Sequence, residues 1–139
     1  MKKTVHIFLL LGALALLGSC KKLVEDRKRD LLVQAMANGQ WHIETFQEGS
    51  ATITDQFAGY NFEFHDNGTI SAIKATIYTA GTWSSDLQNY SITSDFPSAP
   101  DPLKKLNGTW RITDSQTGFV VAELSVSQNK TILHLRKNQ

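Results

Sequence analysis

From residue 40 to the end of the chain, apolar and polar residues alternate in short runs. Trp41 and Ile43 alternate with polar neighbours, and so do Phe62 and Phe64. A period of two places successive side chains on opposite faces of a β-strand. The pattern predicts eight short strands, at residues 41–45, 61–65, 69–78, 80–84, 90–93, 109–113, 118–126 and 131–135. Because turn residues follow these runs and helical patterns rarely intervene, we expect an all-β antiparallel sandwich or barrel.

The second run ends at a strong turn signal. Asn67-Gly68 follows it almost directly, and an Asn-Gly pair predicts a tight hairpin in which both residues take positive φ. We therefore expect the strands on either side of this pair to be antiparallel neighbours.

The connection at residues 94–107 is long and contains all three prolines. Within it Asp101 is a candidate helix cap, and Pro102 suits the first position of a helical turn. Leu103 and Leu106 would then share one face and close an end of the barrel. Two interpretations fit this segment: an irregular connection, or a lid over a cavity.

The first twenty residues have the pattern of an export signal. Met1-Lys2-Lys3 is positively charged, and residues 7–17 form an uncharged apolar run of eleven residues. A helix needs about 20 apolar residues to span a bilayer, so this run predicts the core of a signal peptide. It ends in Leu17-Gly18-Ser19-Cys20, which resembles the lipobox of bacterial lipoproteins.

The lipobox resemblance implies that a diacylglyceryl group is attached to the Cys20 sulfur and that the chain is cut before this residue. Cys20 would then anchor the protein, since two or more acyl chains bind a bilayer stably. Lys21 is not the aspartate associated with inner-membrane retention, which favours the outer membrane of the cell envelope. The alternative is an ordinary secretory signal followed by a free thiol.

The expected organisation has three parts. Residues 1–19 are the lipoprotein signal peptide, and residues 39–139 form the barrel domain. Residues 20–38 between them hold the lipidated cysteine, a charged tether and a short helix. The helix is predicted because apolar residues recur at helical spacing, namely Leu31, Leu32, Ala35 and Met36.

Composition and motifs narrow the function classes. Fourteen Lys plus Arg balance thirteen Asp plus Glu, so no basic surface for nucleic acid is indicated. A single cysteine excludes an internal disulfide and a multi-cysteine zinc site. Because no motif for nucleophilic catalysis, phosphate binding or calcium binding occurs, we expect neither an enzyme nor a cofactor or metal. His42, Glu44 and His134 would lie together if the first and last strands pair, either as a metal or acid–base site or as solvent-facing residues.

Each tryptophan follows a glycine by two residues, in the triplets Gly39-Gln40-Trp41, Gly81-Thr82-Trp83 and Gly108-Thr109-Trp110. A glycine at this position gives backbone freedom where a strand enters the sheet, and the indole ring fills the core. The three rings are therefore core residues or, alternatively, the walls of a ligand site.

The order of these motifs carries a family resemblance. Gly39 to Trp41, Phe62 to Gly68 and Leu106 to Trp110 are similar to segments of small lipocalin-like (calycin-type) lipoproteins of Gram-negative bacteria. The resemblance covers residues 39 to about 136 and implies a small eight-stranded antiparallel up-and-down barrel. It also implies a structural signature of Gly39, Trp41 and a basic residue stacked on that ring, for which Arg136 is the nearest candidate.

The resemblance implies that the barrel carries or senses a small apolar or amphipathic molecule, with Trp83, Trp110 and Phe96 as candidate ligand-binding residues. Alternatively, the barrel acts on a protein partner, for example as an inhibitor, or the chain is a structural lipoprotein without a ligand. Eight-stranded barrels are just wide enough to be filled by side chains or to hold one small ligand. A cavity of about 300 Å³ or more that reaches solvent would favour the carrier, and a filled core would favour the alternatives.

Overall fold

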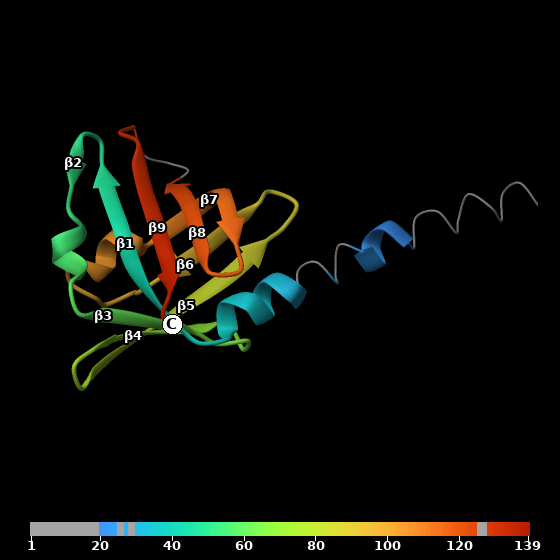
Figure 1. The fold of residues 1–139 in the computed structure, drawn as a ribbon, viewed down its shortest axis with the longest axis horizontal. Helices are drawn as coiled ribbons and strands as arrows, with labels where there is room; N and C mark the ends of the chain where they lie inside the picture. Colours follow the sequence, from blue (N-terminus) through green and yellow to red (C-terminus); the bar gives the residue numbers. More distant parts are fainter. Residues whose placement is uncertain (1–19, 25–26, 28–29, 125–127) are drawn as a thin grey trace, which may run out of the picture.

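The computed structural model describes residues 20–24, 27, 30–124 and 128–139, which form a closed antiparallel β-barrel preceded by a short helix (Figure 1). The strands are β1 (Gln40–Glu48), β2 (Ala51–Thr52), β3 (Tyr60–Phe64), β4 (Thr69–Lys74), β5 (Ile77–Asp86), β6 (Ser91–Asp95), β7 (Gly108–Gln116), β8 (Phe119–Leu124) and β9 (Thr131–Lys137). Two 3₁₀ turns, η1 (Thr54–Phe57) and η2 (Leu103–Leu106), lie in the connections. Because β1 also pairs with β9, eight strands close into a barrel, and β2 is a short addition beside β1.

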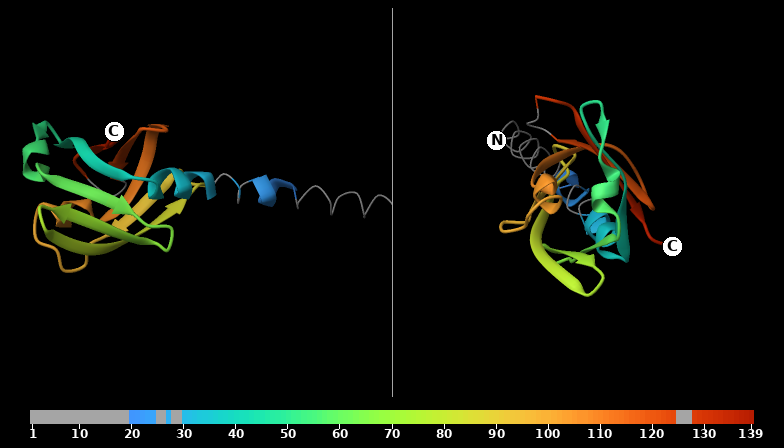
Figure 2. Two further views of the ribbon diagram at one scale, coloured as in Figure 1. Left: turned by 60° about the horizontal axis from the view of Figure 1, so that its bottom comes forward. Right: turned by 90° about the vertical axis from the view of Figure 1, so that its left-hand side faces the viewer.

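The barrel is closed by two unequal seams on either side of β1. The pairing with β9 runs from Trp41 opposite Lys137 to Glu48 opposite Thr131, whereas the pairing with β3 has two residue pairs. The turn η1 covers the gap beside β3, where the Phe57 ring lies 4.9 Å from the ring of Phe46. Figure 2 shows η1 beside the diverging part of β1. The second seam is thus closed by a short backbone pairing and, beyond it, by side-chain packing.

The predicted alternation is confirmed by burial, because alternate residues of the strands point into one core. On β3, Phe62 and Phe64 are buried while Asn61 and Glu63 are partly exposed. The side chains of the core are contributed by every long strand and by η1 and η2. They include Trp41, Phe46, Phe57, Phe62, Phe64, Ile70, Trp83, Ile92, Phe96, Leu103, Leu106, Trp110, Val120, Leu133 and Leu135.

Each end of the barrel is covered by a helical segment. The short N-terminal helix, described at residues 30–37, packs Met36 into the core, and the Trp41 indole donates a hydrogen bond to the Met36 carbonyl at 2.9 Å. The turns η1 and η2 lie at the opposite end (Figure 1). Leu103 and Leu106 of η2 are buried there, as the spacing of these leucines predicted.

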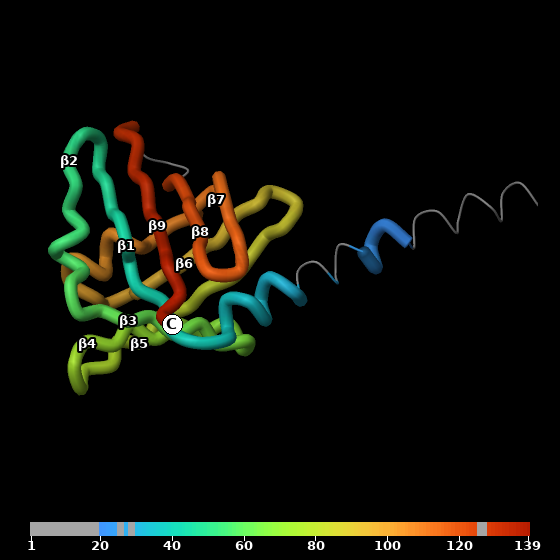
Figure 3. The backbone as a smooth tube through the Cα atoms, in the orientation of Figure 1, coloured from blue at the N-terminus to red at the C-terminus, as the bar shows by residue number. Residues whose placement is uncertain are grey.

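Two local predictions about strands and turns are wrong. The predicted strand 69–78 is interrupted by a two-residue turn at 75–76, which separates β4 from β5 and in which Ala75 has a φ of 54°. The backbone trace reverses there (Figure 3). Because the turn contains no Gly, Asn, Asp or Pro, the sequence held no signal for it.

The Asn67-Gly68 turn joins β3 to β4 as predicted, but its geometry differs. Gly68 has a positive φ of 84°, whereas Asn67 does not. The Asn67 side chain instead accepts hydrogen bonds from the backbone N–H and the hydroxyl of Thr69, at 3.0 and 2.7 Å. The turn is therefore stabilised by an Asx-type contact and not by two left-handed residues.

The predicted cap of η2 is also wrong. Pro102 occupies the cap position, one residue before the helical turn, and no side chain caps it. Backbone hydrogen bonds form the turn, and a salt bridge between Lys105 and Glu48 of β1, with an N–O distance of 2.9 Å, connects it to the barrel. This contact joins the turn to the strand that closes the barrel.

Candidate functional site

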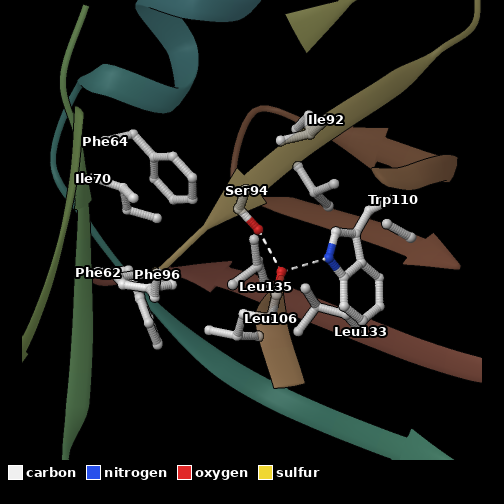
Figure 4. Close-up of a pocket in the computed structure, with 12 residues that line it drawn as sticks. Phe62, Phe64, Ile70, Ile92, Ser94, Phe96, Leu106, Trp110, Leu133 and Leu135 are labelled. Carbon is white, nitrogen blue, oxygen red and sulfur yellow. Dashed lines mark hydrogen bonds between the residues drawn. The ribbon is translucent and has the colours of Figure 1, made fainter. Parts of the chain in front are cut away.

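The barrel interior contains a small apolar cavity with a volume of about 40 Å³. Its wall comes from the inward positions of β3, β4, β6, β7, β8 and β9, together with one residue of η2 and one of the connection before it (Figure 4). The lining residues are Phe62, Phe64, Ile70, Ile92, Ser94, Phe96, Leu106, Trp110, Val120, Ala122, Leu133 and Leu135. Eleven of these twelve are apolar, so the wall offers burial but almost no polar recognition.

The polar groups at the cavity are already paired. The Ser94 hydroxyl donates to the Leu106 carbonyl at 2.5 Å, and the Trp110 indole N–H donates to the same oxygen at 2.9 Å (Figure 4). Among the described residues, no fully buried side-chain nitrogen or oxygen lacks a partner. These two hydrogen bonds join β6 and β7 to the end of η2, so they close the cavity and leave no donor for a guest.

The three predicted ligand-binding residues are buried and lie in two places. Trp110 and Phe96 line the cavity, with 2% and 1% of their surfaces exposed. Trp83 does not line it: its ring meets Phe64 edge-on at 5.2 Å, and its N–H donates to the His65 carbonyl at 2.8 Å. The structure therefore brings two of the three together, and none of them stands at an open rim.

Gly81, which was interpreted as a point of backbone freedom before Trp83, has a different role. A Cβ at this position would lie 2.6 Å from the Asp95 carbonyl oxygen and 2.8 Å from the Phe96 ring. Its φ is not in the left-handed region, so the requirement is for space. The glycine allows Phe96 to pack against β5 and occupy the interior.

The cation over Trp41 is Lys137, not Arg136. The Lys137 Nζ lies 5.7 Å from the centre of the Trp41 ring. Because Leu133 and Leu135 face inward, alternation carries Lys137 to the same side and turns Arg136 outward. Gly39 leaves room for the lysine, since a Cβ there would lie 3.0 Å from its Cε.

Arg136 forms a salt bridge on the outer surface of the barrel. Its Nε and Nη2 donate to the two carboxylate oxygens of Glu44 at 2.7 and 2.9 Å. The hydrogen bonds from Arg136 lower the pKa of Glu44, and the same contact raises the pKa of Arg136. The bidentate contact links β1 to β9 on the outer surface.

The histidines considered as a metal or acid–base site lie on paired strands but do not face each other. The register shifts between Ile43 and Thr45, so that His42 lies opposite Arg136 and His134 opposite Thr45. His42 Nδ1 is 2.6 Å from the Asn138 side-chain oxygen. In the described part of the chain, no group of three or more His, Cys, Asp or Glu residues has a geometry suited to a metal ion.

Cys20, the predicted lipidation site, is exposed at the first described residue of the N-terminal segment. The predicted signal peptide, residues 1–19, lies outside the described residues. Among the described residues, no helix combines the length and apolar character needed to cross a bilayer.

Comparisons with known proteins bear on the fold. No protein-family model and no curated protein matches the chain. Among solved structures, the fold is similar to the crystal structure of a DUF4847 family protein from Bacteroides vulgatus ATCC 8482, with a TM-score of 0.59 and 17% sequence identity. The match covers 77% of this chain and 97% of that chain. At this level of identity the likeness shows a shared barrel architecture.

Proposed function

We propose that this chain is a lipid-anchored protein of the cell envelope, and that its barrel works through its outer surface as an interaction module. The observation that supports this proposal is the size of the interior cavity, about 40 Å³. Sites for small-molecule ligands usually measure about 300–1,000 Å³. The interior therefore has too little space for an acyl chain or an aromatic metabolite without rearrangement.

Access to the interior is also restricted at both ends. Met36 of the N-terminal helix packs into the core at one end, and Leu103 and Leu106 of η2 are buried at the other. Moving η2 outward would break the two hydrogen bonds that the Leu106 carbonyl accepts and leave buried polar groups unpaired. Each such group costs about 1–3 kcal/mol, so opening is unfavourable.

The anchor is supported by the sequence and is compatible with the position of its cysteine. The apolar run at residues 7–17 ends in a lipobox-like segment at Cys20. Cys20 is exposed, so modification of its sulfur would not disturb the barrel. Met36 of the N-terminal helix packs into the barrel at the end away from η1 and η2, so an anchor at Cys20 would approach the barrel from the side of this helix.

Metabolic labelling tests the anchor. Cells expressing the full chain are grown with radiolabelled palmitate, and the protein is isolated and compared with a Cys20→Ser variant. We expect label on the unmodified chain, loss of the label in the variant, and recovery of the labelled protein with outer-membrane fractions. Absence of label from the unmodified chain would reject the lipid anchor.

Native mass spectrometry tests the proposal that the interior is not a ligand site. The purified chain is incubated with a lipid extract of the envelope and analysed for bound molecules. We expect the mass of the polypeptide and its own modification alone. A co-purifying lipid at a stoichiometry of one would reject the proposal and favour a carrier.

The carrier is the second candidate function, and the chemistry of the cavity favours it. Eleven apolar side chains surround a space next to η2, and a movement of that turn would enlarge the space toward solvent. An apolar or amphipathic molecule would then bind by burial alone, with Trp110 and Phe96 as walls.

A further inference from the structure

The outer surface of the barrel has a polar depression of about 480 Å³ over β6 and β7, next to the turn between β5 and β6. It is lined by Asp86, Asn89, Ser91, Thr93, Thr109 and Arg111, and we call it the β6–β7 depression. One carboxylate and one guanidinium lie in this set, so the lining has no net charge. The remaining groups are hydroxyls and an amide, which both donate and accept hydrogen bonds.

Ser91 points to a ligand because the residue is largely buried and its hydroxyl is unpaired within the described part of the chain. The residue is 7% exposed, and among the described residues its side chain makes no hydrogen bond. No fully buried polar side-chain atom lacks a partner in the described part of the chain, so this hydroxyl keeps its contact with the depression. A hydroxyl in this position is free to bond a polar group that enters the depression.

The other lining groups are held in place and retain bonding capacity. The Thr93 and Thr109 hydroxyls lie 2.9 Å apart across the β6–β7 pair. Asp86 accepts three hydrogen bonds from its own turn, and those from Asn89 lower its pKa and keep it an acceptor. Arg111 donates one hydrogen bond to Glu123 at 2.8 Å, and its guanidinium has further N–H groups to offer.

Tyr90 adds an exposed aromatic ring between two lining residues, Asn89 and Ser91. Its side chain is 64% exposed, and its backbone has a φ of 48°. A bulky residue rarely adopts this left-handed conformation, and such strained residues cluster at functional sites. The Tyr90 carbonyl accepts a hydrogen bond from the Ile112 N–H at 2.7 Å, so the strained backbone is fixed against β7.

We propose that the β6–β7 depression, which Tyr90 adjoins in the sequence, binds a neutral oligosaccharide. A sugar presents paired hydroxyls to donors and acceptors of this kind, and an apolar ring face to an aromatic side chain. The absence of net charge in the lining favours a neutral ligand over an anionic one. This inference names a ligand for the proposed interaction module and is independent of the lipid anchor. The turn between β5 and β6 lies at the same end of the barrel as the N-terminal helix (Figures 1 and 2).

Titration calorimetry tests the site with two neutral probes, chitotetraose and maltotetraose, and one anionic probe, tetragalacturonate. The full chain carrying Cys20→Ser is purified in a sugar-free detergent. We expect at least one neutral probe to bind and the anionic probe to bind more weakly. Failure of both neutral probes to bind, or stronger binding of the anionic probe, would overturn the proposal.

Two variants locate the site without disturbing the fold. Tyr90→Gly relieves the left-handed backbone while removing the ring, and Ser91→Ala removes the unpaired hydroxyl. We expect each to weaken binding about fivefold to tenfold, with no loss of unfolding free energy. Tyr78→Ala is the control, because Tyr78 is a 70% exposed tyrosine that neither lines the depression nor adjoins a lining residue in the sequence. Equal weakening in the control, or unchanged binding in both variants, would contradict the assignment.

The outcome is distinguishable from a failure of the proposed function. An envelope lipid bound inside the barrel would reject the interaction module. The sugar titration would still decide whether the β6–β7 depression binds sugar. If the protein binds neither lipid nor sugar, the proposed interaction module stands and the proposed sugar site is rejected. Sugar binding that Tyr90→Gly and Ser91→Ala do not weaken overturns the site as well.

Discussion

Strands β6 and β7 form both the inner cavity and the outer depression, and the two faces differ in how their polar groups are satisfied. Ile92, Ser94 and Trp110 face the cavity, where each polar side chain has a partner. Ser91 and Thr109 belong to the depression, where the Ser91 hydroxyl has no partner among the described residues. The inner face is therefore a packed core, whereas the outer face has polar side chains that can still form hydrogen bonds with a ligand.

The largest expected effect comes from emptying the inner face. Trp110→Ala removes a ring that is 2% exposed and one of two donors to the Leu106 carbonyl. We expect a loss of about 3–5 kcal/mol of unfolding free energy, measured by urea denaturation. Trp110→Phe keeps most of the volume and should cost clearly less. A loss below about 1 kcal/mol in Trp110→Ala would show that this face is not a packed core.

Overfilling the inner face should have the next largest effect. In Gly81→Ala the new methyl group would lie 2.6 Å from the Asp95 carbonyl oxygen and 2.8 Å from Phe96. We expect a loss of about 1–3 kcal/mol in thermal or urea unfolding. Gly118→Ala is the matched control, since no atom lies within 4 Å of its Cβ position. Equal stability of the two variants would argue that the interior yields easily to a guest.

A substitution at the outer face should increase the unfolding free energy instead of lowering it. Tyr90→Gly removes a left-handed tyrosine, and we expect the unfolding free energy to rise by about 0.5–1 kcal/mol after the cost of glycine in the unfolded chain. Ala75→Gly, where φ is 54°, should give a gain of similar sign without any effect on sugar binding. If Tyr90→Gly destabilises the protein, the ring is a packing residue and not a free platform.

The smallest effect concerns the surface pair of Glu44 and Arg136. The folded-state pKa of Glu44 lies below its ordinary value of 4.5, chiefly because of the hydrogen bonds from Arg136. The pair therefore adds stability above the unfolded pKa, and this contribution is lost as the pH falls through the folded pKa. Denaturation curves recorded from neutral pH down to about pH 2 should show this decline in the unmodified chain and a weaker one in Glu44→Gln. Parallel curves would mean that the pair contributes nothing.

The sequence predicted the fold class because its strongest signal is alternation, which depends on burial alone. Phe62 and Phe64 face the core as the alternation predicted, and Leu133 and Leu135 of β9 follow the same rule. The same alternation places Lys137 on the inner side of β9 and Arg136 on the outer side. The prediction that Arg136 stacks on Trp41 was therefore wrong, and Lys137 occupies that position. The turn at Ala75 was missed because its residues have no typical turn chemistry.

The site was harder to predict, because it depends on distances between strands that are far apart in the sequence. Trp83 and Trp110 occupy equivalent triplets, yet only Trp110 lines the cavity. The β6–β7 depression was not predicted at all, since serine and threonine on outward strand positions are ordinary surface residues. Its one detectable signal, a tyrosine immediately before a strand, becomes informative when the backbone conformation of Tyr90 is known.

The contrast between the two faces is tested most directly by methyl NMR of one sample that carries labels on both. The methyl groups of Ile92, Leu106, Leu133 and Leu135 report on the cavity, and those of Thr93 and Thr109 report on the depression. On addition of lauric acid, we predict no shift of the inner methyl groups, and on addition of chitotetraose or maltotetraose, shifts of the threonine methyl groups. Saturable shifts of the inner methyl groups with lauric acid, and none at the threonines with either sugar, would contradict the account.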